Sequence, residues 1–457
     1  MSFIAELRSK RVLIVGAGTT GKSLANYLQT LGVEFSIIDE RVEPFDGLEV
    51  LSEIPDAIDF DLALVSPGWR KDHNFISNLN SRGIEVLSEL DFAWSLKEEL
   101  NPKQRWVALT GTNGKTTTVQ MLESILRSAG KSAIACGNVG TTVVEAVTSE
   151  NRFEILAIEL SSFQIEWSTM PRYEAVAILN IAEDHIDWHG SFGTYANTKM
   201  SLLKRSDLAI LNLNDPEITL RSATWTGRKV YFGFGSPQVG EIGIVEDLLI
   251  DRSFVTTTDA AEVIAELSDV KPAVPHNVAN AMAAAGLALA LGIAHPLIKA
   301  GIANFKLDKH RLETVYEADG IAWINDSKAT NPHAASAALL SHFSNIWIAG
   351  GLAKGANMDE LVKRTKSRIK AAIVYGKDGE LIARALAEYA PKITIYRIAK
   401  STSAPGMMDE IVSCALKIAT TGDTVLLAPA CASMDQFSSY AERGNLFAQS
   451  VERLVAK

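Results

Sequence analysis

Cysteine is scarce in this sequence, with three residues among 457. Cys136, Cys414 and Cys431 have spacings that fit neither a disulfide framework nor a zinc knuckle, so a reducing compartment is the simplest expectation. Positive charge is also in short supply, because 44 Lys and Arg residues face 54 Asp and Glu residues, for a net charge of −10. This balance argues against a general nucleic-acid or anionic-membrane surface, while it leaves room for local basic pockets that bind phosphorylated small molecules.

The first residues lack the apolar core expected of a signal peptide, and no long apolar run occurs in the sequence. Charged residues at Glu6, Arg8, Lys10 and Arg11 interrupt the start of the chain, and the longest apolar stretch, residues 281–294, is too short to span a bilayer. We therefore expect a soluble cytoplasmic protein. Hydrophobic residues make up 47% and charged residues 21%, the composition of a globular chain whose length suggests about three domains.

Short β-branched runs alternate with amphipathic stretches along nearly the whole chain. This alternation is typical of parallel sheets with crossover helices, so we predict an α/β fold. A polar stretch at residues 96–104 and the end of an Ala-rich helix near residue 300 divide the pattern. We predict three domains, at residues 1–98, 99–302 and 303–457.

The first glycine-rich segment, GAGTTG at residues 16–21, follows a predicted strand and opens a predicted helix. A GxGxxG turn of this kind lets backbone N–H groups approach a diphosphate, and Asp39, at the end of the next strand, stands where a ribose hydroxyl would be met. Taken alone, the segment favours a nicotinamide dinucleotide. A glycine turn that serves only helix packing is the alternative.

A second motif, TGTNGKTT at residues 110–117, is sharper. Its ending is that of a P-loop, in which N–H groups cradle phosphates, Lys115 reaches the β- and γ-phosphates, and the Thr116 hydroxyl holds Mg²⁺. It departs from the GxxxxGK[ST] form, because Leu109 occupies the first glycine position. The strand before it and the helix after it favour ATP binding over a chance match. A hydride-transfer enzyme needs no triphosphate cradle, so this motif weakens the dehydrogenase interpretation.

Two candidate metal ligands follow the P-loop motif. Glu159 lies in the apolar run ILAIELSS, where an unpaired carboxylate is costly to bury, and in a P-loop fold such a strand end faces Mg²⁺. A buried Arg or Lys partner is the alternative for Glu159. His185, in the loop NIAEDHIDWHG, would either complete a metal shell or bond to its neighbours, and Asp184 and Asp187 are weaker candidates.

The last third of the chain places polar residues at three predicted strand ends. These are the segments DSKATN at residues 326–331, Gly350-Gly351 with Lys354 nearby, and PACAS at residues 429–433. Ligands of parallel sheets bind at the carboxyl ends of strands, and lysines there suit an acidic substrate. Ordinary solvated loop lysines are the alternative.

Together these strings resemble the Mur ligases. The match runs in order along nearly the whole chain, through GAGTTGKS, SPG at residues 66–68, TGTNGKTTT, GNVG at residues 137–140, ELSSFQIE, NIAEDHIDWH, HNVANAMAA at residues 276–284, HRLE, INDSKATN, AGGLAK and APACASMDQF. Several are ATP motifs of the whole family, whereas ELSSFQIE, DSKATN and PACASMDQF are characteristic of its D-glutamate-adding members. The resemblance implies a Rossmann-like first domain, a central P-loop ATPase-like parallel sheet and a Rossmann-like third domain.

The chemistry implied by the resemblance is that of an ATP-dependent amide ligase in peptidoglycan precursor synthesis, and hence in cell-wall growth, cell shape and cell division. The γ-phosphoryl group of ATP would pass to the carboxylate of UDP-N-acetylmuramoyl-L-alanine, and the acyl phosphate would then accept the amine of D-glutamate. Two Mg²⁺ ions would neutralise the charge that gathers there. The UDP substrate, ATP and the amino acid would bind the first, second and third domains respectively, in a monomer.

The resemblance also implies roles for individual residues. Catalysis is expected of Lys115, His185 and Lys199, and magnesium binding of Thr116, Glu159, His185 and, once carbamylated, Lys199. ATP contacts are expected at Gly111, Thr112, Asn113, Gly114, Lys115, Thr116, Thr117, Thr118, Asn280, Arg311 and Asp326. The UDP substrate is expected at Gly18, Thr19, Thr20, Asp39, Arg41, Ser66, Asn138 and His185. D-glutamate is expected at Lys328, Thr330, Lys354, Ser433 and Tyr440. Asp39 is thereby reassigned from ribose to uracil, and without the resemblance Lys199 would be interpreted as an exposed helix lysine.

Two departures from the family pattern concern the D-glutamate pocket. Tyr440 stands where relatives have Phe, and Leu352-Ala353 replaces the Asp-Gly that some members carry before the lysine. Within the superfamily, the alternatives are a ligase that adds another amino acid and a folylpolyglutamate synthetase. From other classes, the alternatives are a nicotinamide-dependent oxidoreductase and a catalytically dead nucleotide-binding regulator.

Overall fold

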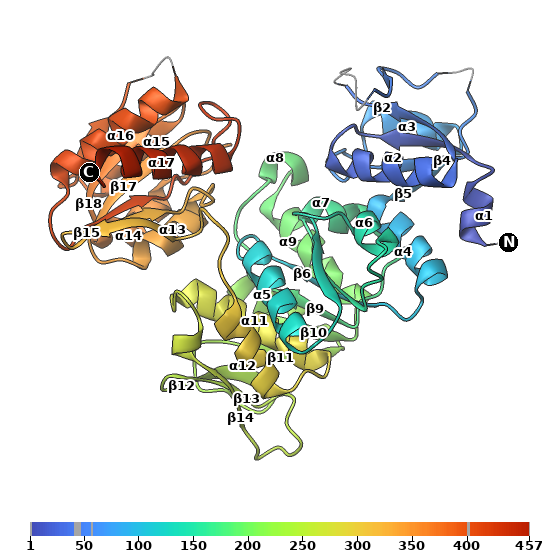
Figure 1. Cartoon of the computed structure of the whole chain (residues 1–457), viewed down its shortest axis with the longest axis horizontal. Coiled ribbons are helices and arrows are strands. Elements are labelled where there is room, and N and C mark those ends of the chain that lie inside the picture. Colours follow the sequence, from blue (N-terminus) through green and yellow to red (C-terminus); the bar gives the residue numbers. More distant parts are fainter. Residues whose placement is uncertain (1, 41–46, 56–57, 400–402, 457) are drawn as a thin grey trace. The chain divides into compact units, whose positions relative to one another are not determined.

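The computed structural model describes residues 2–40, 47–55, 58–399 and 403–456 of the chain. Within these residues lie three sheets, each flanked by helices (Figure 1). The chain divides into two compact units. Unit 1 comprises residues 1–181, 185–273 and 277–305, and unit 2 comprises residues 182–184, 274–276 and 306–457. The α/β class predicted from the sequence is confirmed.

The first sheet is parallel and has the order β3-β2-β1-β4-β5. Its strands are β1 (Arg11–Val15), β2 (Glu34–Ile38), β3 (Val50–Leu51), β4 (Leu62–Val65) and β5 (Glu85–Ser88). The helices around it are α1 (Phe3–Leu7), α2 (Thr19–Leu31), α3 (Asn74–Ser81) and α4 (Glu89–Leu100). The order is that of a Rossmann-type sheet, which places the GxGxxG turn between the central strand β1 and helix α2.

The central sheet has nine strands in the order β14-β13-β12-β11-β10-β9-β6-β8-β7. They are β6 (Arg105–Thr110), β7 (Ala133–Gly137), β8 (Ile155–Glu159), β9 (Ala175–Ile178), β10 (Leu208–Asn212), β11 (Arg228–Phe232), β12 (Glu241–Val245), β13 (Leu248–Asp251) and β14 (Glu262–Glu266). Strands β6 to β12 pair in parallel, as predicted, whereas β13 is antiparallel to both of its neighbours. The sequence pattern did not indicate this antiparallel extension.

Helices and short 3₁₀ turns connect the strands of the central sheet. They are α5 (Lys115–Ser128), α6 (Val143–Thr148), α7 (Ser162–Trp167), α8 (Ile186–His189), α9 (Phe192–Met200), η1 (Ser201–Arg205), α10 (Pro216–Ser222), η2 (Leu267–Asp269), α11 (Pro275–Ala290) and α12 (His295–Asn304). The P-loop motif therefore lies between β6 and α5. Strand β6 is buried at every residue after Arg105, as a continuous apolar run predicts, and helix α5 buries residues at helical spacing, such as Leu122, Ile125 and Leu126.

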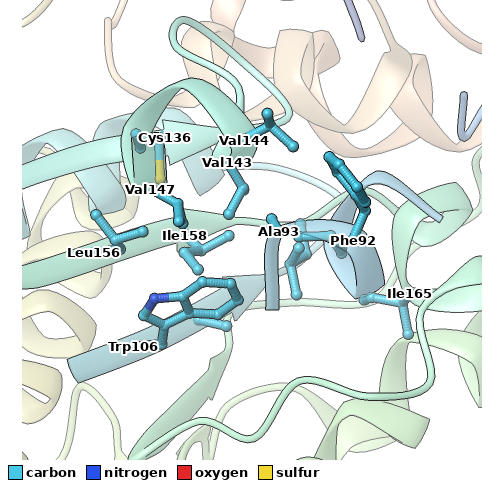
Figure 2. Close-up of a cluster of buried hydrophobic side chains, with 14 of the residues drawn as sticks. Phe92, Ala93, Trp106, Cys136, Val143, Val144, Val147, Leu156, Ile158 and Ile165 are labelled. Atoms are coloured by element: carbon cyan, nitrogen blue, oxygen red, sulfur yellow. The ribbon is translucent and has the colours of Figure 1, made fainter. Parts of the chain in front are cut away.

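Helix α4 joins the cores of the first two sheets within unit 1. Its residues Phe92 and Ala93 belong to one buried cluster with Val143 and Val144 of α6 and with Trp106 of β6 (Figure 2). The polar stretch at residues 96–104 is thus helical up to Leu100 and not an extended linker. The domain boundaries remain predictions.

The third sheet, in unit 2, has the order β15-β16-β20-β17-β18-β19. Its strands are β15 (Glu313–Ala318), β16 (Ile321–Asn325), β17 (Asn345–Gly350), β18 (Ile369–Tyr375), β19 (Thr394–Arg397) and β20 (Thr424–Leu427). The helices and the 3₁₀ turn of this unit are α13 (Pro332–Leu340), α14 (Asp359–Thr365), η3 (Lys366–Arg368), α15 (Gly379–Tyr389), α16 (Ala404–Ile418) and α17 (Tyr440–Leu454).

All pairs in this third sheet are parallel except β15 with β16. Because β16, β20 and β17 are neighbours, the three polar segments that follow them emerge at the same edge of the sheet. In the part of the chain that the structure describes, we find no helix with the length and apolarity needed to cross a membrane.

Candidate functional site

The P-loop segment turns sharply into helix α5. Gly114 caps the helix with a φ of 81°, and a Cβ at this position would lie 2.4 Å from Asn280 Oδ1, so only glycine fits here. Lys115 folds back over the loop, where its Nζ donates to Gly111 O at 3.0 Å and to Thr112 O at 2.9 Å. The structure therefore brings Asn280, predicted as an ATP contact, against the loop that is predicted to hold the phosphates.

Lys199 is buried beneath the same loop. Its side chain is 2% exposed, and its Nζ donates to Gly111 O at 2.9 Å and to Thr110 Oγ1 at 3.3 Å. The ammonium also lies 4.8 Å from the centre of the Tyr195 ring, whose hydroxyl is 3.0 Å from Thr112 Oγ1. This burial excludes the reading of Lys199 as an exposed helix lysine.

Glu159 ends strand β8, next to the strand that leads into the P-loop. Its side chain is 1% exposed, and Oε1 accepts a hydrogen bond of 3.0 Å from Asn138 Nδ2. The other oxygen, Oε2, is buried and has no hydrogen-bond partner among the described residues. A buried carboxylate oxygen without a donor is costly, and a hard cation such as Mg²⁺ would satisfy it.

His185 lies at the N-terminus of the one-turn helix α8 with a φ of 52°, a left-handed conformation that is uncommon outside glycine. Its ring packs edge-on against Phe163 at a centroid distance of 4.8 Å, and Phe163 follows Glu159 by four residues. His189, on the same helix, is within 2.9 Å of Ser162 Oγ. The segments that carry Glu159 and His185 are therefore packed together.

The turn at residues 16–21 is as tight as the GxGxxG pattern predicts. A Cβ at Gly21 would lie 1.9 Å from Gly16 O, so glycine is required where α2 crosses β1. The N–H of Ala17 donates to Asp39 Oδ2 at 2.8 Å, which makes Asp39 a brace of the turn. Ser66 Oγ lies close to Gly16 and is buried, with no hydrogen-bond partner in the described part of the chain.

The remaining residues predicted to bind the UDP substrate fall into three groups. Gly18 and Thr19 are exposed and Thr20 is half-buried at the start of α2. Asn138 donates two hydrogen bonds to Glu159, one from its side-chain Nδ2 to Oε1 and one from its backbone N–H to the backbone oxygen. Arg41 lies outside the described residues.

In unit 2, the residues predicted to bind D-glutamate gather at one edge of the third sheet. Lys328 Nζ lies 5.0 Å from the centre of the Tyr440 ring. Leu352 and Ala432 form an isolated β-bridge, which holds the segment of Lys354 beside that of Ser433. Thr330 lies on the segment DSKATN at residues 326–331, which is joined to the third segment by the Ala430 N–H, which donates to Ala329 O at 2.9 Å. Two ammonium groups and hydroxyls near one edge suit an amino acid with two carboxylates.

Asp326 lies at the end of β16 in the same unit. Burial raises its pKa to about 7, against the lowering effects of the Leu312 N–H, which donates to Oδ1 at 3.2 Å, and of the Arg311 charge. The structure thus brings Asp326 near Arg311, as expected for two residues that were predicted to contact the same ligand.

Comparison with known proteins covers most of the chain. Residues 10–88 match the MurD-like N-terminal domain of Mur ligases, residues 109–288 the Mur ligase middle domain, and residues 310–431 the glutamate ligase domain of Mur ligases. The chain is 41% identical to a UDP-N-acetylmuramoylalanine--D-glutamate ligase of Thermobifida fusca, with 98% of this chain and 100% of the relative covered. It belongs to the Mur ligase family. A relative of the same name from Streptomyces coelicolor is also 41% identical, with 99% of this chain and 100% of the relative covered.

Solved structures of other Mur-type ligases share the fold. A pseudomurein peptide ligase type C from Methanothermus fervidus superposes with a TM-score of 0.62 at 18% identity, covering 98% of this chain and 100% of that one. MurF from Acinetobacter baumannii gives a TM-score of 0.60 at 18% identity, covering 99% and 93%. At this identity the likeness concerns the α/β fold alone.

The residues around the P-loop of this Mur ligase fit a magnesium ion. Glu159 Oε2 is a buried oxygen in need of a cation, and the Thr116 hydroxyl lies in the first turn of α5. No cluster of three or more His, Cys, Asp or Glu side chains occurs in residues 2–40, 47–55, 58–399 and 403–456 that could hold a metal by itself. A bound ion would therefore draw further oxygens from the nucleotide, as Mg²⁺ does at phosphate sites.

Sequence reasoning missed one residue that organises the edge of the third sheet where D-glutamate is predicted to bind. Arg443 of α17 is fully buried and donates to Ser327 Oγ at 2.9 Å, Ser327 O at 2.8 Å and Cys431 O at 3.1 Å, with a longer contact to Gly350 O. It thereby ties together all three polar segments at the edge of the third sheet. Its only sequence signal was a charged residue in an otherwise amphipathic helix, which usually means exposure.

Proposed function

We propose that this chain joins D-glutamate to UDP-N-acetylmuramoyl-L-alanine at the expense of ATP, a step of peptidoglycan precursor synthesis. Two relatives named for this ligation are 41% identical over 98% and 99% of the chain. The N-terminal match to the MurD-like domain supports the same branch of the family. A ligase for another amino acid and a folylpolyglutamate synthetase are the rival proposals.

The observation that carries the proposal is the arrangement of charge around the P-loop. The Nζ atoms of Lys115 and Lys199 both donate to Gly111 O, at 3.0 Å and 2.9 Å. On the neighbouring strand, Glu159 keeps one buried oxygen without a donor. The Lys115 cation, which can turn to phosphate oxygens, beside a carboxylate that can take a metal, is what phosphoryl transfer from ATP requires.

The reaction divides into two transfers. In the first, a carboxylate oxygen of the L-alanyl group forms a bond to the γ-phosphorus of ATP, and ADP leaves. In the second, the D-glutamate amine nitrogen forms a bond to the acyl carbon and loses a proton to solvent, and inorganic phosphate leaves with the pair of electrons of the C–O bond. Lys115 would exchange its two carbonyl acceptors for phosphate oxygens and hold the transferred group in line.

Thr116, Glu159 and His185 would hold Mg²⁺, together with Lys199 if it is carbamylated, and we propose two ions per site. Bound Mg²⁺ supplies charge neutralisation for the phosphate oxygens. Asn138 fixes the orientation of Glu159 through Oε1, which leaves Oε2 for the ion. Phe163 restricts the His185 ring by packing against it.

The remaining assignments follow the domain division that we propose. Residues 1–98 would bind the UDP substrate, residues 99–302 ATP and residues 303–457 the amino acid. The dicarboxylate of D-glutamate would meet Lys328, Thr330, Lys354, Ser433 and Tyr440, while Arg311 and Asp326 would contact ATP. We further propose a monomeric enzyme of the cytoplasm.

The test is phosphate release from ATP by the purified protein. We expect release only when Mg²⁺, UDP-N-acetylmuramoyl-L-alanine and D-glutamate are all present. Omission of each component in turn provides the controls. Equal activity with L-glutamate or with a diamino acid would contradict the D-glutamate specificity and favour the rival ligases.

A further inference from the structure

Asn180, which lies just after strand β9 and is not among the predicted site residues, fixes the backbone of the P-loop by hydrogen bonds. Strands β6 and β9 pair in parallel as far as Thr110 and Ile178. The pairing then continues past the strand ends, since Leu179 N donates to Thr110 O at 2.9 Å and Thr112 N donates to Asn180 O at 2.9 Å. The start of the loop is thus an extra strand segment on β9.

The Asn180 side chain completes this pairing with both of its polar atoms. Its Oδ1 accepts the N–H of Asn113 at 2.8 Å, and its Nδ2 donates to Asn113 O at 3.0 Å. A carboxamide that bonds both the backbone N–H and the backbone C=O of one residue takes the place of a paired strand residue. Its two hydrogen bonds therefore fix the orientation of that residue's backbone. Asn113 N–H therefore points at Asn180, and the chain enters helix α5 directly after it, at Gly114.

This arrangement explains how the loop works without the first glycine of the usual P-loop string. Leu109 occupies that position inside β6, so the backbone freedom that a glycine would give there is missing. The two hydrogen bonds from the Asn180 side chain to Asn113 instead fix the backbone conformation of the loop. Phosphates would then be met by the N–H groups of the first turn of α5, since the first turn of any helix lacks acceptors within the helix.

We propose that Asn180 is a positioning residue for the β- and γ-phosphates of ATP, which acts through the peptide of Asn113. The inference rests on the proposed function only in taking the loop as the ATP site. Asn180 need not touch the nucleotide. Its loss would let residues 112–114 move and would widen the cradle, so nucleotide affinity should fall while the UDP substrate and D-glutamate bind as before.

The experiment measures ADP·Mg²⁺ affinity by titration calorimetry and the KM values of all three substrates for Asn180→Ala, Asn180→Asp and Asn180→Ser. Asn180→Ala should raise the ADP Kd and the ATP KM at least about tenfold, the cost of two lost hydrogen bonds. Asn180→Asp keeps the acceptor for Asn113 N–H but sets a carboxylate oxygen against Asn113 O, so it should be at least as harmful. Asn180→Ser, which keeps one polar atom, should be intermediate and serves if the alanine variant does not fold.

Asn212→Ala is the matched control. Asn212 ends the next strand, β10, and its Nδ2 donates to Leu179 O at 2.8 Å, so the variant loses a similar amide bond one residue from Asn180. Its ADP Kd and ATP KM should stay within about twofold of wild type, since Asn212 donates to Leu179 O and not to the loop residue Asn113, and the net worth of one such hydrogen bond is small.

A folded Asn180→Ala or Asn180→Ser variant with wild-type ADP affinity would overturn the inference, as would an equal loss for all three substrates. Because ADP binding is measured without turnover, the two claims fail separately. Wild-type protein that binds ADP but does not ligate D-glutamate would refute the proposed function, and the ADP titrations of the variants would still decide the role of Asn180.

Discussion

Asn138 donates a 3.0 Å hydrogen bond to one oxygen of Glu159, and the second oxygen of that buried carboxylate has no partner among the described residues. The pair leaves Oε2 as the single oxygen of Glu159 available to bind a cation. Glu159→Gln should therefore lower kcat at least about 100-fold, because an amide cannot neutralise a metal, and the Mg²⁺ concentration for half-maximal rate should rise.

The matched control for Glu159→Gln is Glu154→Gln, since Glu154 immediately precedes strand β8 and forms an exposed pair with Lys131. Steady-state rates over a range of Mg²⁺ concentrations check the prediction. A glutamine variant that keeps the wild-type Mg²⁺ dependence would show that Glu159 is not a metal ligand.

Lys115→Ala should lower turnover by about 100- to 1,000-fold while the affinity for the UDP substrate stays nearly unchanged. The lysine Nζ lies on the loop carbonyls of the central sheet, whereas the turn at residues 16–21 belongs to the first sheet. Loss of one preorganised cation at a transferring phosphoryl group costs on the order of 3–4 kcal/mol, or about 100- to 1,000-fold in rate. Calorimetry with the UDP substrate and rate assays measure the two quantities.

Lys131→Ala is the control for this variant, because Lys131 follows helix α5 at its far end and forms an exposed pair with Glu154. It should keep both properties. An equal loss of turnover and UDP-substrate affinity in Lys115→Ala would contradict the division of the two sites between the first and second sheets.

Much of the P-loop geometry was predictable, because strand, loop and helix are adjacent in the sequence and each has its own pattern. The runs that became β1 and β6 are continuous apolar strands, and the GKT ending placed Lys115 at the start of helix α5, just after the loop that follows β6. Asn180 and Arg443 were not predictable, because their partners lie 67 and 116 residues away and each looks like an ordinary polar residue in its own segment.

The burial of Lys199 was likewise invisible in the sequence. Its helix α9 has only a weak apolar pattern, and a lysine in such a helix usually faces solvent. Only the meeting of α9 with the end of β6 puts the ammonium against Gly111 O. Local periodicity thus gives the elements, whereas the buried polar contacts between them depend on the tertiary fold.

Glu89 gives unit 1 a pH-dependent stability. Burial raises its pKa from 4.5 to about 7, even though Val144 N donates to Oε1 at 2.8 Å and so lowers it. The folded chain binds this proton more tightly than the unfolded chain, so the free energy of unfolding falls as pH rises from about 4.5 to 7. The loss is on the order of 3 kcal/mol.

Thermal unfolding of Glu89→Gln at pH 5 and pH 8 checks this prediction. The difference in Tm between variant and wild type should shift in favour of the variant at pH 8, because glutamine carries no charge to bury. Glu98→Gln, an exposed carboxylate on the same helix α4, should show no such shift. The same pH dependence in wild type and Glu89→Gln would refute the assignment.

Arg443→Lys should destabilise unit 2 and weaken D-glutamate binding. The buried guanidinium donates hydrogen bonds to Ser327, Cys431 and Gly350, and a single ammonium group cannot reach all of these acceptors. Leaving buried carbonyls without donors costs about 2–4 kcal/mol, and the three segments that carry the D-glutamate residues would loosen. Tm and the D-glutamate KM measure the two effects.

Arg453→Lys, on the exposed side of the same helix and paired with Asp409, is the control for Arg443→Lys. It should leave both values close to wild type. Wild-type stability and KM in Arg443→Lys would mean that the buried hydrogen bonds do not organise the amino-acid site.

The most direct test of the proposed chemistry traces a carboxylate oxygen of the substrate into the released phosphate. UDP-N-acetylmuramoyl-L-alanine labelled with ¹⁸O in its alanyl carboxylate is incubated with the protein, ATP, Mg²⁺ and D-glutamate, and the released phosphate is analysed by mass spectrometry. An acyl phosphate requires one labelled oxygen to leave with each phosphate, so we predict singly labelled phosphate in proportion to the amide formed. Amide formation with unlabelled phosphate would contradict phosphoryl transfer to the carboxylate.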